Sequence, residues 1–300
     1  MDPALERFSP ATREWFAGAF PTPTPAQTGA WQAISSGRHA LVVAPTGSGK
    51  TLSAFLWSID RLAGSRQARP PGTRVLYISP LKALGVDVER NLRSPLVGIT
   101  QTAKRLGVEV PPISVGVRSG DTTSADRRLL QRDPPDILIT TPESLYLMLT
   151  SAARETLAGV ETVIVDEIHA VAATKRGAHL AVSLERLDAL LEKPAQRIGL
   201  SATVRPIDEV ARFLGGQVPV EIVQPPAAKT FDLRVVVPVE DMTELGARAT
   251  AEQLDDDEGA LQSAGSIWPH VDRAIVDTVL EHRSTIVFAN SRRLAERLTA

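Results

Sequence analysis

The most informative segment of the sequence lies near the N-terminus and reads Ala44-Pro45-Thr46-Gly47-Ser48-Gly49-Lys50-Thr51. It follows a buried-strand run, Leu41 to Ala44, and precedes an amphipathic helical pattern from Thr51 to Leu62. A glycine-containing turn between a strand and a helix lets backbone N–H groups face inward, and the helix N-terminus adds partial positive charge. This context is that of a phosphate-binding loop, although Ala44 occupies the first position, where the standard pattern has glycine.

The loop predicts the contacts of a nucleoside triphosphate. Lys50 is expected to reach the β- and γ-phosphates, and the Thr51 hydroxyl is expected to ligate Mg²⁺. A glycine-containing turn that only resembles the motif is the alternative, and the intact Gly-Ser-Gly-Lys-Thr run in the correct place disfavours it. The predicted ATP-binding residues of the loop are Thr46, Gly47, Ser48, Gly49, Lys50 and Thr51.

Short apolar runs alternate with helical patterns along the rest of the first two thirds of the chain. Further strands are predicted at Val75–Ile78, Ile113–Val117, Ile137–Thr140, Val163–Asp166 and Arg197–Leu200. A representative helical pattern covers Ala178 to Leu191. Near-continuous apolar strands separated by helices indicate a parallel sheet covered on both faces. We therefore predict a doubly wound α/β domain whose ligands gather at the carboxyl ends of its strands.

A domain boundary is predicted where prolines and small residues cluster, from Val223 to Lys229. We assign residues 1–222 to a first domain, 223–232 to a linker and 233–300 to the start of a second domain. The second part contains two predicted strands, Leu233–Val237 and Thr285–Ala289, and helices at Val271–His282 and from Arg292 onward. One strand–helix–strand–helix unit cannot cover both faces of a doubly wound sheet, so this second domain is expected to be partial.

Composition limits the possible classes of protein. The chain has 300 residues, 43% of them hydrophobic and 23% charged, which is typical of globular domains. It contains no cysteine, which excludes disulfides, thiolate metal sites and thiol catalysis and fits a reducing cytoplasm. No run approaches the ~20 apolar residues that cross a bilayer, so we predict a soluble chain without membrane contact. The net charge of −2 means that any nucleic-acid partner requires a local basic groove.

A second motif, Asp166-Glu167-Ile168-His169, follows the strand run Val163–Val165. Asp166 is expected to contact Mg²⁺ through its water shell, and Glu167 to act as general base for the attacking water. His169 is expected to relay the state of the γ-phosphate to neighbouring loops. An acidic pair at a strand end can instead be a helix-capping feature, and its pairing with the phosphate loop favours the catalytic role.

These motifs, followed by Ser201-Ala202-Thr203, resemble those of superfamily-two DEAD/DEAH-type helicases. The segments Phe20–Gln27, Ser79–Leu84 and Ser266–His270, and the run Ser284–Arg293, are similar to the large helicase-related (Lhr) branch. The resemblance extends from about Phe8 over nearly the whole chain. It implies that both domains have the RecA-like fold and that the chain is the N-terminal part of a longer enzyme.

The resemblance also implies roles for individual residues. Gln27 matches the glutamine that recognises adenine, although a polar helix residue is the alternative. Ser201 and Thr203 match a motif that couples the γ-phosphate to the grip on a nucleic-acid strand. For the strand contacts of Thr141 and Ser291, simple helix capping is the alternative. The residues matched to contacts with nucleic-acid phosphates are Pro80, Lys82, Arg118, Thr141, Pro142, Ser291 and Arg292.

The implied activity is ATP-dependent, 3′→5′ translocation on single-stranded DNA or RNA with unwinding of duplexes, in DNA repair. In this family, arginine fingers come from a helix near the end of the second domain, and no such segment follows Arg293. Because an arginine finger contributes about 10³–10⁵ in rate, the 300 residues alone are expected to bind ATP and hydrolyse it poorly. The alternatives are a short product that binds nucleotide or nucleic acid without catalysis, and a remodelling NTPase that separates no strands.

Overall fold

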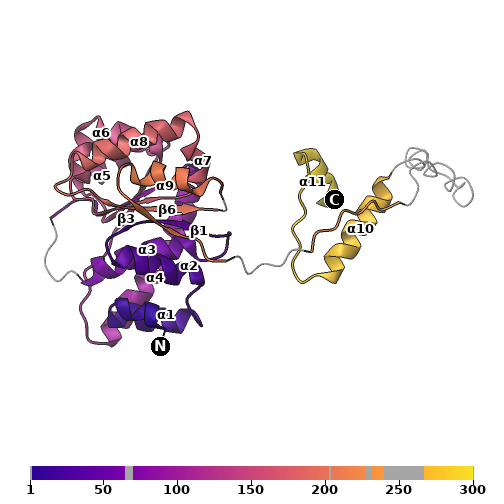
Figure 1. Ribbon diagram of the computed structural model, residues 1–300, viewed down its shortest axis with the longest axis horizontal. Helices are drawn as coiled ribbons and strands as arrows, with labels where there is room; N and C mark the ends of the chain where they lie inside the picture. The colour runs from indigo at the N-terminus through magenta and orange to yellow at the C-terminus, as the bar shows by residue number, and fades with distance from the viewer. Residues whose placement is uncertain (1, 65–69, 203, 227–231, 240–266, 300) are drawn as a thin grey trace, which may run out of the picture. The chain divides into compact units, whose positions relative to one another are not determined.

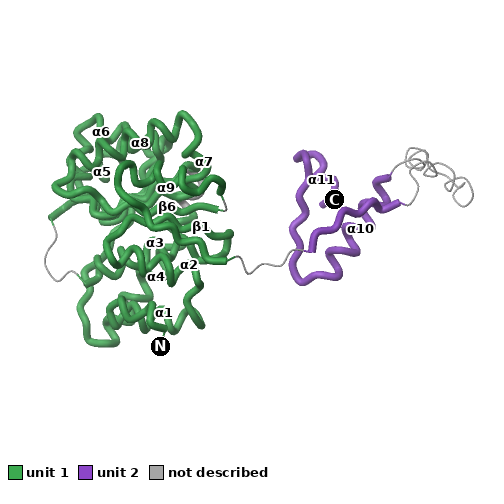
Figure 2. Tube along the Cα trace, viewed as in Figure 1, with its two compact units in different colours: residues 1–228 green, residues 229–300 purple. Residues whose placement is uncertain are grey.

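The computed structural model describes residues 2–64, 70–202, 204–226, 232–239 and 267–299. The chain divides into two compact units, residues 1–228 and 229–300 (Figure 2). In the part of the chain that the structure describes, nearly all the regular structure belongs to the first unit, which positions most of the residues discussed below. Among the described residues, no helix is long and apolar enough to cross a membrane.

The first unit is built on a seven-stranded sheet in the order β3-β4-β2-β5-β6-β1-β7, and each neighbouring pair is parallel. This arrangement confirms the predicted RecA-like α/β fold. The strands are β1 His39–Val43, β2 Val75–Ile78, β3 Val115–Arg118, β4 Ile137–Thr140, β5 Thr162–Val165, β6 Gln196–Ser201 and β7 Val220–Val223.

Helices cover both faces of this sheet (Figure 1). One face carries α1 Pro10–Ala19, α2 Pro25–Ser35, α3 Lys50–Gly64 and α4 Lys82–Arg105. The other carries α6 Pro142–Leu149, α7 His169–Ala172, α8 Lys175–Asp188 and α9 Ile207–Gly215. The helix α5 Ser124–Arg132 connects β3 to β4, and short 3₁₀ helices cover η1 Pro3–Arg7 and η2 Ala152–Leu157.

Two apolar layers form the core, one on each face of the sheet. Strand β2 contributes to both, because successive side chains of a strand point to opposite faces. Tyr77 packs in the layer that contains Trp31 and Phe55, whereas Leu76 and Ile78 pack in the other layer. Both faces of the central strands are thus buried, which accounts for the continuous apolar runs in the sequence.

The second unit corrects two of the predicted strands. It contains α10 Trp268–Glu281 and α11 Arg292–Thr299, but Leu233–Val237 and Thr285–Ala289 are not strands. Val235 and Phe288 are 100% and 91% exposed. A β-branched run becomes a strand only where a neighbour accepts its backbone hydrogen bonds, and the described part of this unit supplies none.

Two smaller differences concern the first unit. Strand β3 covers Val115–Arg118, two residues beyond the predicted start at Ile113. Strand β7, Val220–Val223, was not predicted at all. It is a four-residue edge strand whose side chains are only partly buried, so it lacks the apolar run that marked the others.

Candidate functional site

The order of the strands divides the carboxyl edge of the sheet into two neighbouring halves. In one half, β5, β6 and β1 are adjacent, and they end at Asp166, Ser201 and the phosphate loop. In the other half, β3, β4 and β2 are adjacent, and they end at Arg118, Thr141 and Ser79-Pro80. Segments that are far apart in the sequence therefore form two groups. One group contains the residues predicted to contact the nucleotide, and the other contains residues predicted to contact a nucleic-acid strand.

The phosphate loop has the backbone that its glycines permit. Gly47 and Gly49 have φ angles of 81° and 79°, in the region that residues with a Cβ rarely adopt. The Lys50 ammonium lies over the loop and donates to the carbonyl oxygens of Ala44 at 2.6 Å and Pro45 at 2.9 Å. The buried Ser48 hydroxyl has no hydrogen-bond partner among the described residues.

Gln27 lies behind this loop and is 4% exposed. Its side-chain Oε1 accepts from the Thr24 backbone N–H at 2.9 Å, and its backbone N–H donates to the Thr24 hydroxyl at 3.2 Å. The Thr24 hydroxyl donates to the Ser48 carbonyl at 2.8 Å. A Cβ at Gly49 would lie 2.5 Å from Gln27 Nε2. The capping box of α2 therefore packs directly against the phosphate loop and fixes its position.

The acidic motif begins with the Asp166 carboxylate, which a donor from the buried strand β2 holds in place. Asp166 is 8% exposed, and its Oδ2 accepts a short hydrogen bond from the Tyr77 hydroxyl. Burial, together with the negative charge of Asp166, raises the pKa of Tyr77, so the hydroxyl stays protonated and remains a donor. Asp166 Oδ1 accepts from the Glu167 N–H at 2.9 Å. Tyr77 was not predicted as a site residue, because within a buried strand it is indistinguishable from a core residue.

Glu167 and His169 continue the motif into a polar chain. Glu167 has a φ of 44°, a conformation that costs a residue with a Cβ about 1–2 kcal/mol. His169 Nε2 lies 3.4 Å from a Glu167 carboxylate oxygen, and His169 Nδ1 lies 3.1 Å from the Ser201 hydroxyl. The acidic motif is thus connected to the end of β6. Thr203, the other predicted coupling residue, lies outside the described residues.

A cavity of about 550 Å³ joins the loop to the acidic motif. Helix α4 was not predicted to contribute, although Asp87, Asn91 and Pro95 share one face at a spacing of four residues. Gln27, Ser48 and His169 are not among the lining residues. The cavity is lined by Thr46, Gly47, Gly49, Lys50, Thr51, Leu52, Phe55, Asp87, Val88, Asn91, Leu92, Pro95, Asp166 and Glu167.

The residues of the first unit that are predicted to contact a nucleic-acid strand lie at the other half of the carboxyl edge of the sheet, where β3, β4 and β2 end. Ser79, Arg118 and Thr141 line one shallow depression. The Thr140 hydroxyl donates to the Arg118 carbonyl at 2.8 Å, and burial lowers the pKa of Arg118. Arginine side chains stay protonated in proteins, so Arg118 is a cation. Thr141 caps α6 by accepting from the Ser144 N–H at 3.4 Å.

Pro142, Lys82, Ser291 and Arg292 complete the set of predicted strand contacts. Pro142 and Lys82 are the first residues of α6 and α4, so both lie at the same edge. Ser291 and Arg292 belong to the second unit and are exposed. The Ser291 hydroxyl accepts from the Leu294 N–H at 3.2 Å, and Arg292 pairs with Glu296 at 2.9 Å.

The residues around the cavity fit a magnesium–nucleotide complex. The Lys50 ammonium, whose residue lines the cavity, is a donor for phosphate oxygens. The Thr51 hydroxyl and the Asp166 carboxylate are hard oxygen donors that line the same cavity. No cluster of three His, Cys, Asp or Glu side chains among the described residues could hold a metal alone. Mg²⁺ is commonly bound by one or two carboxylates together with substrate phosphates and water, which is the arrangement this cavity offers.

Comparison with known proteins defines the class. The DEAD/DEAH box helicase family matches residues 24–211, which include the phosphate loop, the acidic motif and Ser201. The chain therefore belongs to the DEAD/DEAH box helicases.

Particular relatives within this class cover nearly the whole chain. It is 67% identical over 296 residues to the Lhr helicase/probable uracil glycosylase of Mycolicibacterium smegmatis and 58% identical over 299 residues to the Lhr helicase/uracil glycosylase of Escherichia coli. These matches cover 99% and 98% of the chain, which spans 18% and 19% of the lengths of the two relatives. The solved structure of Mycobacterium smegmatis helicase Lhr bound to ssDNA and AMP-PNP superposes with a TM-score of 0.80 over 99% of this chain and 36% of that one.

Proposed function

We propose that this chain carries the ATP site and the first strand-binding surface of an ATP-dependent nucleic-acid helicase. The observation that carries the proposal is the order of the strands, which places the phosphate loop, Ser201 and the acidic motif side by side. The predicted strand contacts lie on the adjoining three strands of the same edge. One rigid sheet therefore links the two sites that a translocating enzyme must couple.

The chemistry assigned to the cavity is hydrolysis of the γ-phosphate. Lys50 would exchange its two loop carbonyls for phosphate oxygens, and Thr51 and Asp166 would hold Mg²⁺. The ion would neutralise charge on the phosphates. Glu167 lines the cavity beside Asp166 and would accept a proton from the attacking water. Tyr77 keeps the Asp166 carboxylate oriented from the core.

Coupling to the strand would begin at His169. Its ring contacts both Glu167 and Ser201, so a change at the general base reaches the end of β6 through two polar contacts. We assign to Gln27 the recognition of adenine, for which its carboxamide would exchange the bond to Thr24 for one to the base. The arginine fingers of the family's second domain would complete the catalytic cleft at full rate.

The strand contacts address the phosphate backbone and support single-stranded DNA or RNA as the ligand. Arg118, Thr141 and the N-terminus of α6 offer a cation, a hydroxyl and helix N–H groups, none of which identifies a base. The relative solved with ssDNA and AMP-PNP supports the same pair of ligands. We carry over from the family the 3′→5′ polarity, the unwinding of duplexes and a role in DNA repair as parts of this proposal.

Strand-stimulated ATP hydrolysis tests the function. A protein that joins this chain to the rest of the family's second domain should hydrolyse ATP faster when oligothymidine or oligouridine is added, and Glu167→Gln should abolish its turnover while AMP-PNP still binds. The 300 residues alone should bind AMP-PNP and hydrolyse ATP poorly. Glu192→Gln, at an exposed position after α8, is the matched control and should hydrolyse ATP normally. ATP hydrolysis without strand stimulation would favour a remodelling NTPase. Nucleotide binding without any turnover would favour a non-catalytic binding protein.

A further inference from the structure

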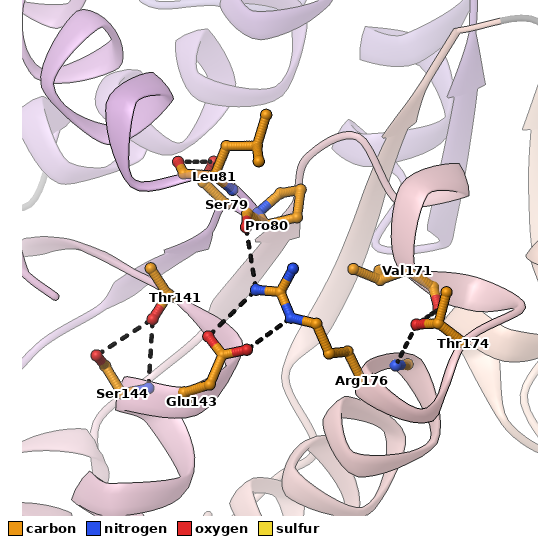
Figure 3. Close-up of polar contacts among 10 residues, drawn as sticks. Ser79, Pro80, Leu81, Thr141, Glu143, Ser144, Val171, Thr174 and Arg176 are labelled. Atoms are coloured by element: carbon orange, nitrogen blue, oxygen red, sulfur yellow. Dashed lines mark hydrogen bonds and ion pairs between the residues drawn. The ribbon is translucent and has the colours of Figure 1, made fainter. Parts of the chain in front are cut away.

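Arg176 joins two loops that lie far apart in the sequence. It is near the start of α8, and its Nε donates to Glu143 Oε1 at 2.6 Å while its Nη2 donates to Glu143 Oε2 at 3.2 Å. The same Nη2 donates to the Pro80 carbonyl at 3.0 Å. Figure 3 shows the guanidinium between the carboxylate and this carbonyl. We call Arg176, Glu143 and the Pro80 carbonyl the Arg176 clamp.

The two loops that the clamp joins are both assigned to strand binding. Pro80 lies in the loop after β2, and Glu143 lies in the first turn of α6, directly after Thr141 and Pro142. The hydrogen bonds from Arg176 lower the pKa of Glu143, so the carboxylate is ionised and the clamp is closed at neutral pH. The clamp therefore fixes the spacing between the loop after β2 and the N-terminus of α6, which would contact successive parts of one phosphate backbone.

Arg176 is itself held by the segment that follows the acidic motif. The Thr174 hydroxyl donates to the Val171 carbonyl of α7 at 2.7 Å, as Figure 3 also shows. It also accepts from the Gly177 N–H at 3.1 Å. A Cβ at Gly177 would lie 2.1 Å from the Val171 carbonyl oxygen. This approach requires glycine and packs α8 closely against α7, which begins at His169. The acidic motif and the clamp are therefore joined by a short, closely packed segment.

The clamp contributes position rather than stability. The Arg176 and Glu143 side chains are 45% and 55% exposed, and ion pairs this open to water contribute little to folding. Arginine is nevertheless the only side chain whose planar fork can engage a carboxylate with two nitrogens and still donate to a carbonyl. The chemistry at this position is suited to holding three groups in one fixed geometry.

We propose that Arg176 is a positioning residue that sets the two strand-binding loops in register and ties them to the acidic motif through α7. The proposal rests on the proposed function, since it assigns a role in strand binding. The alternative is that Arg176 leaves Glu143 and contacts a strand phosphate directly. The two roles differ in what happens when Glu143 is removed. If Arg176 is a positioning residue, loss of Glu143 should disorder the clamp and weaken nucleic-acid binding. If Arg176 contacts a phosphate directly, loss of Glu143 should free Arg176 to bind that phosphate.

The test measures the affinity of the full chain for fluorescein-labelled oligothymidine in the presence of AMP-PNP, over a range of salt concentrations. The variants are Arg176→Ala, Arg176→Lys, Glu143→Ala and the Arg176→Ala/Glu143→Ala double variant. Lys175→Ala is the matched control, because it removes a positive charge from the neighbouring, exposed position. AMP-PNP affinity without the strand and the thermal midpoint report whether the nucleotide site and the fold remain intact.

A clamp predicts that Arg176→Ala, Arg176→Lys and Glu143→Ala each weaken strand binding by about 5- to 10-fold, the lower range of a coupling between sites. The double variant should be no weaker than either single alanine variant, because the two residues act as one unit. The salt dependence, the AMP-PNP affinity and the Lys175→Ala variant should match the wild type.

Several results would overturn the clamp. Stronger strand binding by Glu143→Ala, normal binding by Arg176→Lys, or a salt slope smaller by about one phosphate in Arg176→Ala would each show direct contact instead. Unchanged binding by Arg176→Ala, when the wild type binds, would refute the clamp alone. Failure of the wild type to bind the strand would refute the proposed function and the clamp with it.

Discussion

Replacing Tyr77 with phenylalanine removes the hydroxyl that holds the Asp166 carboxylate from the core side. Tyr77 is fully buried, and its ring stacks on Phe55 with centroids 5.1 Å apart. Phenylalanine keeps the ring and this packing, so the substitution deletes one hydroxyl and its hydrogen bond to the Asp166 carboxylate. The perturbation therefore isolates the contribution of a single donor beneath the proposed magnesium ligand.

The expected magnitude follows from the surroundings of Asp166. A hydrogen bond to a charged group contributes about 1.5–3 kcal/mol to stability. Asp166 borders the cavity, so water can partly replace the lost donor and the lower end applies. We expect a loss of about 1.5 kcal/mol, which lowers the thermal midpoint of a unit of this size by roughly 3–6 °C. AMP-PNP affinity should fall about tenfold when Mg²⁺ is present, equivalent to about 1.4 kcal/mol, and should be unchanged when Mg²⁺ is chelated.

Scanning calorimetry gives the stability, and titration of AMP-PNP with Mg²⁺ or with a chelator gives the two affinities. Tyr146→Phe is the control, because Tyr146 is half-buried on α6 and its hydroxyl makes no hydrogen bond with a described residue. That control should change stability by less than about 0.5 kcal/mol. A Tyr77→Phe variant that matches it in stability and in magnesium dependence would refute the role assigned to Tyr77.

Three further predictions concern the loop, the coupling residues and pH. Gly49→Ala should weaken AMP-PNP binding at least about tenfold, because its Cβ would lie 2.5 Å from Gln27 Nε2. Gly37 has the same φ of 79°, but a Cβ there would meet no atom within 4 Å. Gly37→Ala is therefore the control, which carries only the backbone cost of about 1–2 kcal/mol and should bind AMP-PNP normally. Equal AMP-PNP affinities for these two variants would contradict the packing argument. Ser201→Ala should reduce strand stimulation of ATP hydrolysis about fivefold and leave AMP-PNP affinity unchanged, since it removes the contact with His169; unaltered stimulation in steady-state assays would exclude this relay. Burial, assisted by the charge of Arg197, lowers the pKa of His39 in the folded chain. As the pH falls below about 6.5, the unfolded chain therefore binds a proton at His39 before the folded chain does, and the free energy of unfolding should decrease. Urea titrations of His39→Gln should lose this part of the pH dependence, and a pH profile identical to that of the wild type would contradict the role of His39.

The fold could be predicted from the sequence because the central strands are buried on both faces. Runs such as Val75–Ile78 and Ile137–Thr140 are apolar at every position or nearly so, and they occur where the structure has β2 and β4. β7 gave no such signal, because an edge strand needs only partial burial. The opposite error occurred at Thr285–Ala289, where an apolar run has no neighbouring strand among the described residues of its unit.

The candidate site was predictable where chemistry fixes both residue type and spacing. The phosphate loop and the acidic motif are local patterns, and the strand order then places them on the same edge of the sheet. Tyr77 and Arg176 could not be predicted in this way. Their partners lie 89 and 33 residues away, and neither side chain is unusual in a strand or at the start of a helix. Such contacts depend on which elements become neighbours, which a single sequence does not specify.

A calorimetric titration of the chain with AMP-PNP and Mg²⁺, comparing the wild type with Lys50→Ala, tests whether the phosphate loop binds the nucleotide. Lys193→Ala, at an exposed position after α8, controls for the loss of a lysine. We expect one nucleotide per chain for the wild type and Lys193→Ala, and an affinity at least about tenfold lower for Lys50→Ala. Equal affinities for all three chains would contradict the assignment of the phosphate loop as the nucleotide site.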